Sequence, residues 1–143
     1  TRAYASLWTR LPFVAGGAVG AGFFAVNPAG RARWGAFPDI ISDDTFARMQ
    51  FTPEERVEVP ATYDWPMVEG FSNLVRVRRR QDEGVAEIHA KYPDLPRNEG
   101  KARLGPGGMF RLMASQPLNF AVYAAVHLAV RLRRGSGEWT RGR

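Results

Sequence analysis

The sequence predicts an α/β fold, and three segments of the chain lead to this prediction. Residues 14–26 are apolar but rich in glycine, which favours a strand, or a loop where backbones approach closely. The segment ERVEVPATY, residues 55–63, is typical of a short strand. Residues 66–91 carry apolar side chains at helical spacing, which indicates a long helix. We therefore expect a few strands packed by this helix.

The composition is that of one globular domain. The chain has 143 residues, of which 45% are hydrophobic and 24% are charged, enough for one domain with a core. The absence of cysteine excludes disulfides, thiolate metal sites and cysteine nucleophiles. A formal net charge of +6 attracts polyanions, which include nucleic acid, anionic lipid and nucleotide diphosphates, and does not choose among them.

In the first half of the chain, residues 1–13 are expected to form a short helix that ends at Pro12. The glycine-rich run at residues 14–26 is too short for a membrane span of about 20 residues. A helix is expected at residues 43–51, ahead of the strand at residues 55–63.

In the second half, the helix over residues 66–91 begins with Pro66, which suits a first helical position. Residues 93–108 are expected to be a loop or linker. An apolar helix is expected within residues 109–134, running roughly from Pro117 onward, and residues 135–143 form a basic tail.

The apolar stripe of the long helix is interrupted by charge. At helical spacing the stripe runs through Arg78, which lies within the block RVRRR, and then through Asp82 before it becomes apolar again at Val85. One interpretation is a solvated basic face with extended side chains. The other is a turn that faces a polar cleft, where guanidinium groups bind phosphate oxygens.

The acidic pair Asp43–Asp44 also has two interpretations. Ser42 or Asp43 suits the N-cap of a helix, and carboxylates in a first helical turn suit the helix dipole. A carboxylate on a rigid helix start can also act as a general base toward an acceptor hydroxyl. The two roles are compatible in one residue.

In chain order, the segments GAVGAGFFAV, RWGAFPDIISDDTFARMQF, ERVEVPAT and NLVRVRRRQDEG resemble the C-terminal, acceptor-side half of a family 2 glycosyltransferase with the GT-A fold. Gly20 and Gly22 match a glycine strand at the acceptor floor. Asp43 and Asp44 match the acidic pair, with Asp44 at the position of the catalytic base. The arginine motif of the family falls in the region of Arg78, Arg79 and Arg80.

The resemblance covers roughly residues 4–88 and implies a partial, Rossmann-like α/β domain over residues 1–92. It implies an inverting transfer of a sugar from a nucleotide-diphosphate sugar to a glycan or lipid-linked acceptor. A divalent metal, Mg²⁺ or Mn²⁺, is implied for the intact enzyme. The sequence contains no Asp-x-Asp motif, so we expect a fragment whose metal ligands and donor site lie mostly outside this chain, and we assign no metal ligand within it.

The apolar C-terminal run has two interpretations, a core helix and a helix at a membrane interface. The arginines that follow it directly would suit a membrane interface. The resemblance favours a cytoplasmic protein, peripheral at the inner face of the plasma membrane. The alternative function is a non-catalytic basic domain that associates with membranes or with nucleic acid, although no nucleic-acid-binding module is spelled out. His89 is expected on a helix surface and His127 at an interface.

Overall fold

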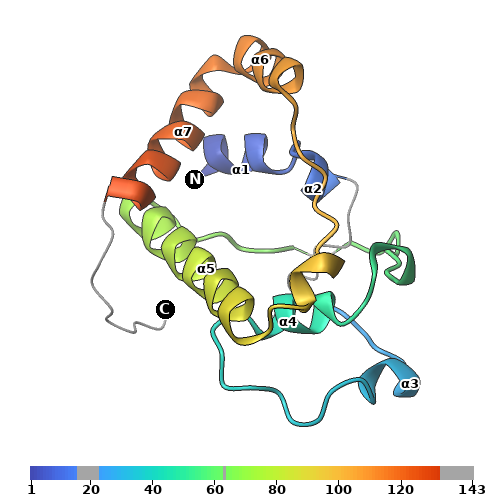
Figure 1. The fold of residues 1–143 in the computed structure, drawn as a ribbon. Coiled ribbons are helices and arrows are strands. Elements are labelled where there is room, and N and C mark those ends of the chain that lie inside the picture. Colours follow the sequence, from blue (N-terminus) through green and yellow to red (C-terminus); the bar gives the residue numbers. More distant parts are fainter. Residues whose placement is uncertain (16–22, 63, 133–143) are drawn as a thin grey trace.

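The computed structural model describes residues 1–15, 23–62 and 64–132, and the regular elements in these ranges are helices (Figure 1). In chain order they are α1 (Arg2–Trp8), α2 (Pro12–Ala15), α3 (Pro28–Arg31), α4 (Asp43–Met49), η1 (Pro53–Glu55), α5 (Phe71–Lys91), η2 (Leu95–Asn98), α6 (Pro106–Ser115) and α7 (Pro117–Leu132).

The expected α/β fold, and with it the partial Rossmann-like domain, is wrong for the described residues, which contain no strand. Residues 55–62 run as irregular chain after η1, and Val57 and Val59 are 80% and 63% exposed. A half-buried strand needs a partner strand and a core beneath it, and the exposed Val57 and Val59 have neither among the described residues. Residues 23–26 are also irregular, and Val14 and Ala15 belong to helix α2. Residues 16–22 of the expected glycine strand, with Gly20 and Gly22, lie outside the described residues.

Helix α5 is the longest element, and its start differs from the prediction. It begins at Phe71 rather than at Pro66, because Gly70 adopts a φ of +86°, outside the helical region. It ends at Lys91, where the sequence places its end. The expected helix over residues 1–13 is likewise divided: α1 ends at Trp8, and Pro12 begins the short α2 instead of ending a helix.

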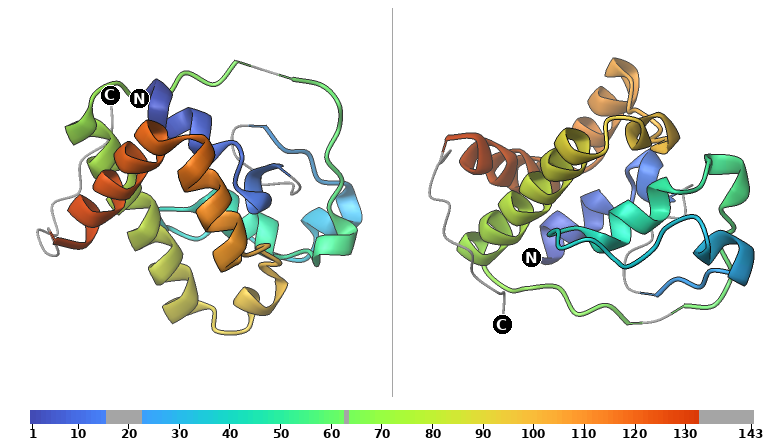
Figure 2. Two further views of the ribbon diagram at one scale, coloured as in Figure 1. Left: turned by 90° about the horizontal axis from the view of Figure 1, so that it is seen from above. Right: turned by 60° about the horizontal axis from the view of Figure 1, so that its bottom comes forward.

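The N-terminal half of α5 packs against α1 and α7. These three helices bury one cluster of side chains, namely Tyr4, Leu74, Val75, Val126 and Val130. Figure 2 shows α7 crossing α5 with α1 alongside. This cluster forms the upper core in the orientation of Figure 1.

The C-terminal half of α5 packs against α4 and the segment before it. Here Ile88 of α5, which is fully buried, packs in one cluster with Phe46, Ala47 and Met49 of α4. Trp34 also belongs to this cluster. Helix α4 spans Asp43–Met49, which confirms the predicted helix to within two residues. Helix α5 therefore connects two separate cores.

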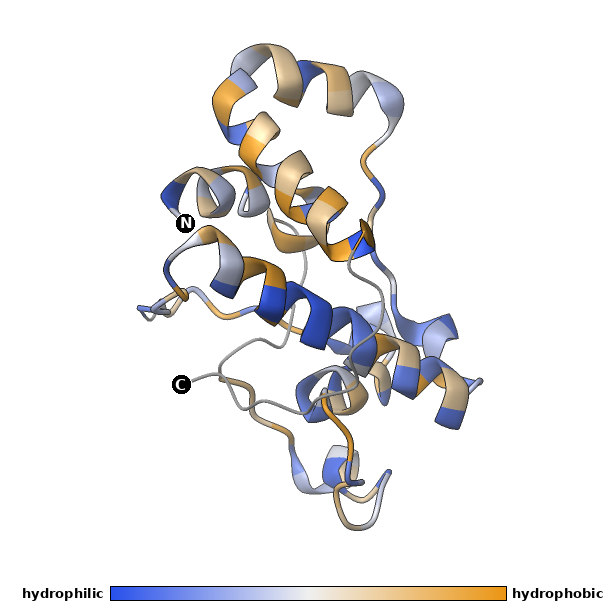
Figure 3. Ribbon diagram, turned by 90° about the vertical axis from the view of Figure 1, so that its left-hand side faces the viewer, coloured by the Kyte–Doolittle hydropathy of each residue, from blue (hydrophilic) through white to orange (hydrophobic). Residues whose placement is uncertain are grey.

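The C-terminal region contains two helices where one was expected over residues 109–134. Helix α6 begins at Pro106, inside the expected linker, and stops at Ser115; Pro117 then starts α7. The expected loop at residues 93–108 also contains η2. In Figure 3, α6 and α7 carry mostly apolar residues, whereas the middle of α5 is strongly hydrophilic.

Candidate functional site

The acidic pair opens helix α4 and binds the backbone of its first turn. An oxygen of Asp43 accepts a hydrogen bond from the Asp44 N–H at 2.9 Å, and an oxygen of Asp44 accepts one from the Thr45 N–H at 2.6 Å. Ser42 is the N-cap but makes no side-chain capping bond. Asp43 is exposed and Asp44 is half-buried. The aspartates thus take the helix-start role that their position predicts.

This helix start is fixed against α5. A Cβ on Gly84 would lie 2.9 Å from Ser42 Cβ and 3.0 Å from Ile41 Cγ2, so only a glycine fits between the two segments. One turn farther along α5, a Glu87 oxygen accepts a hydrogen bond from the Ile41 N–H at 3.0 Å. Hydrogen bonds from Lys91 and from this backbone N–H lower the pKa of Glu87. The start of α4, which carries the acidic pair, is therefore held in a fixed position against α5.

The arginines of the predicted phosphate motif are divided between two sides of α5. Arg80 precedes Gly84 by four residues, so it lies on the side of α5 that faces the acidic helix start, about 6 Å along the axis. It is exposed, and no other described residue forms a hydrogen bond or ion pair with its guanidinium. Arg79 has a buried Nε without a hydrogen-bond partner among the described residues.

Arg78 lies on the other side of α5. Its guanidinium donates to Gln81 at 3.0 Å and forms an i,i+4 ion pair with Asp82. Its charge acts on Tyr4, Tyr123 and His127. Arg78 and Asp82, the two charged residues in the apolar stripe of α5, therefore lie near side chains of α1 and α7.

An aromatic cluster that the sequence did not lead us to expect lies at this place. The rings of Tyr4 and Tyr123 stack with centroids 5.2 Å apart, and those of Tyr123 and His127 lie 4.3 Å apart. Tyr4 Oη and His127 Nε2 are buried without hydrogen-bond partners among the described residues. Burial raises the pKa of Tyr4 to about 12. The signals that point to this cluster are the charged break in the α5 stripe and a histidine inside an apolar run.

Burial is also the main cause that lowers the pKa of His127; the neighbouring Arg78 and Arg131 lower it further, and Asp82 opposes them. His127 lies at the interface of α1 and α7, as its place in an apolar run predicts. His89 is exposed on α5, also as predicted.

The metal that the glycosyltransferase resemblance implies has ligands expected mostly outside this chain, and none is assigned within the described residues. No three His, Asp or Glu side chains within these ranges gather as a metal site would require. Asp43 and Asp44 are both engaged with backbone N–H groups.

The expected membrane association does not include a span in this part of the chain. None of the helices in residues 1–15, 23–62 and 64–132 has the length and apolarity needed to cross a bilayer.

Comparison of the chain with known protein families, with curated proteins and with solved structures finds no match. The function is therefore inferred from the residues and their geometry.

Proposed function

We propose that this helical unit supplies the acceptor side of an inverting glycosyltransferase. The observation that carries the proposal is the fixed position of the acidic helix start on α5, about one helical turn from the exposed Arg80, which pairs with no other described residue. A carboxylate held on a packed helix start is suited to accept a proton from an acceptor hydroxyl. The proposal needs no sheet within the described residues.

In the proposed reaction, Asp44, or its neighbour Asp43, removes the proton of the acceptor hydroxyl. The acceptor oxygen then bonds to the anomeric carbon of a nucleotide-diphosphate sugar, with inversion, and the bond to the diphosphate breaks. Negative charge develops on the leaving diphosphate, and fixed cations stabilise it. Arg80 is available for this role, whereas Arg78 is held by Asp82. The groups that bind the donor are expected outside this chain.

The test is sugar transfer by the protein expressed from its complete reading frame. Radiolabelled UDP-glucose, UDP-N-acetylglucosamine and GDP-mannose serve as donors, and a membrane extract serves as the acceptor source. Replacing a general base is expected to lower the transfer rate by about 10²–10⁴-fold without unfolding the protein. Asp44→Asn and Asp43→Asn decide which carboxylate is the base, and Asp39→Asn, an exposed acid before the helix, is the control.

A second pair of variants tests which arginine of α5 acts in the transfer reaction. Arg80→Gln is expected to lower transfer with little loss of stability, and Arg78→Gln is expected to lower stability first, because it leaves Asp82 unpaired near the aromatic cluster. Wild-type transfer rates in both Asp43→Asn and Asp44→Asn would end the assignment of a base in this pair.

A second candidate function, peripheral binding to an anionic membrane, is supported by a different observation. We define the basic layer as residues 1–15 and 101–132, which contain no Asp or Glu. Its six cations are all exposed: Arg2, Arg10, Lys101, Arg103, Arg111 and Arg131. Large apolar side chains on α6 and α7 are also exposed, namely Met109, Phe110, Met113, Leu118, Leu128 and Leu132. Exposed apolar side chains among cations are typical of interfacial helices.

Co-sedimentation with phosphatidylglycerol-containing vesicles, against pure phosphatidylcholine vesicles, tests this candidate. The double variant Phe110→Ser/Leu118→Ser is expected to bind anionic vesicles more weakly. The matched control is Val57→Ser/Val59→Ser, which removes similarly exposed apolar side chains outside the basic layer. Equal vesicle binding by the two double variants would contradict the assignment of a membrane surface to the basic layer. An affinity for DNA that falls steeply with salt, without vesicle binding, would indicate nucleic acid as the partner.

A further inference from the structure

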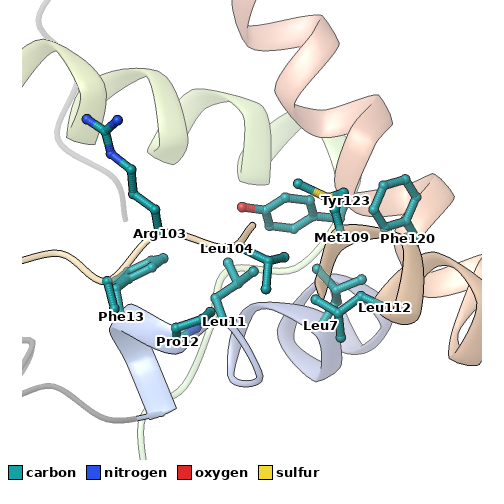
Figure 4. Close-up of a pocket in the computed structure, with 11 residues that line it drawn as sticks. Leu7, Leu11, Pro12, Phe13, Arg103, Leu104, Met109, Leu112, Phe120 and Tyr123 are labelled. Carbon is teal, nitrogen blue, oxygen red and sulfur yellow. The ribbon is translucent and has the colours of Figure 1, made fainter. Parts of the chain in front are cut away.

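An apolar groove lies inside the basic layer, between α1–α2 on one side and α6–α7 on the other (Figure 4). It has a volume of about 350 Å³, within the range of roughly 300–1,000 Å³ that ligand pockets occupy. Six of its lining residues show its chemical character: Leu11, Phe13, Ala102, Arg103, Met109 and Tyr123. Among the described residues, its walls are hydrocarbon and aromatic rings, with one charged side chain, Arg103.

The groove depends on a close approach between the extended segment before α6 and the first turn of that helix. A Cβ on Gly108 would lie 2.6 Å from Leu104 Cδ1, so a glycine at this position lets Leu104 lie directly on α6. Ala102 and Arg103 on the same segment line the groove. Met109 is 44% exposed, and its flexible thioether side chain can adapt to an occupant.

The charged side chain that lines the groove is a cation. Arg103 is exposed and lines it, and Arg111 follows on α6. The nearest carboxylate along the chain, Glu99, forms an ion pair with Lys101, and Asp82 of α5 acts on Tyr123 of the lining. Apolar walls select a hydrocarbon chain, because burying apolar surface is favourable. A cation beside such walls selects an anionic group at the end of that chain.

We propose that this groove binds the hydrocarbon chain of a single-chain anionic amphiphile, with Arg103 contacting its head group. This function goes beyond sugar transfer and does not depend on it. It also differs from adsorption to a bilayer, because the site encloses one chain of a monomeric ligand.

The test is isothermal titration of the chain with dodecyl phosphate below its micelle-forming concentration. One saturable site is expected. Across a series of alkyl phosphates of increasing chain length, affinity is expected to rise by up to about fourfold per added methylene until the groove is filled. An affinity that does not depend on chain length would overturn the proposal, because it would indicate a site for the phosphate alone. Absence of saturable binding would also overturn it.

Two variants with matched controls locate the site. Ala102→Trp places a large side chain in the groove and is expected to lower the affinity at least tenfold, whereas Ala114→Trp, on an exposed part of α6 outside the lining, leaves it unchanged. Arg103→Gln is expected to lower the affinity for dodecyl phosphate about two- to fivefold, as for an exposed ion pair, and not that for dodecanol. Arg2→Gln removes the same charge from an exposed residue of α1 outside the lining and is the control.

These outcomes separate the groove from the other proposals. If the Ala102→Trp variant still binds phosphatidylglycerol vesicles but no longer binds dodecyl phosphate, the groove is a site for a hydrocarbon chain that is distinct from adsorption to a bilayer. Equal losses in Ala102→Trp and Ala114→Trp, with circular dichroism unchanged in both, would refute it. The alkyl series on the wild-type chain decides the matter if a tryptophan variant does not fold.

Discussion

Replacing Gly84 by alanine tests whether the acidic helix start is fixed on α5 as described. Gly84 is buried in the middle of α5, where a glycine would ordinarily weaken a helix. The new methyl group would stand 2.9 Å from Ser42 Cβ and 3.0 Å from Ile41 Cγ2, both closer than normal van der Waals contact. The substitution therefore forces the segment before α4 away from α5.

Two effects of opposite sign set the magnitude. Alanine favours a helix over glycine by about 0.8–1 kcal/mol at an open position. Overpacking a close contact costs about 1–3 kcal/mol. The expected result is a loss of up to about 2 kcal/mol in the free energy of unfolding, which for a chain of this size lowers Tm by several degrees.

Urea denaturation followed by circular dichroism measures this change, with two comparisons. Gly107→Ala, on α6 with open space around the new methyl, is expected to leave stability unchanged or raise it. Ser42→Gly removes the side-chain atoms nearest to the methyl group that Gly84→Ala introduces, at a cost of a few tenths of a kcal/mol for the N-cap. The double variant Gly84→Ala/Ser42→Gly is therefore expected to be more stable than Gly84→Ala alone.

The packing of α5 against the helix start is refuted if Gly84→Ala by itself raises the free energy of unfolding by about 1 kcal/mol, the value for an open helix. That result would mean that Ser42 and Ile41 do not contact α5. It would also remove the fixed position of the acidic pair on which the proposed function depends.

Further predictions concern the aromatic cluster. Because burial lowers the His127 pKa below its unfolded value of about 6.5, the folded state loses stability as pH falls below that value. His127→Phe is expected to reduce the difference in Tm between about pH 7.5 and 5.5, whereas His89→Phe, at an exposed site, keeps it. Tyr4→Phe removes a buried hydroxyl without a hydrogen-bond partner among the described residues and is expected to raise the free energy of unfolding by about 1 kcal/mol. Because the Tyr4 pKa is raised to about 12, wild-type stability is lost as pH rises from the unfolded value of about 10 through 12, and Tyr4→Phe is expected to lose less; an unchanged alkaline transition would contradict this.

Helices that depend on local signals were predicted well. The end of α5 at Lys91, the start of α4 at Asp43 and the start of α7 at Pro117 follow from spacing, capping residues and proline, all of which act within a few residues. The expected strands failed for the opposite reason. A strand is stabilised by a partner elsewhere in the chain, and residues 55–62 meet none among the described residues.

The sequence by itself determined the acidic pair at a helix start and the charged break in the α5 stripe, because each is a matter of residue order. Only the tertiary structure decided that Arg80 lies on the side of the acidic pair while Arg78 lies beside Tyr4 and His127. Likewise, only the structure shows that Gly84 is the contact point for Ser42 and that an apolar groove forms beside Arg103. These features depend on which helices pack together, and packing between residues far apart in the chain leaves no periodic trace in the sequence.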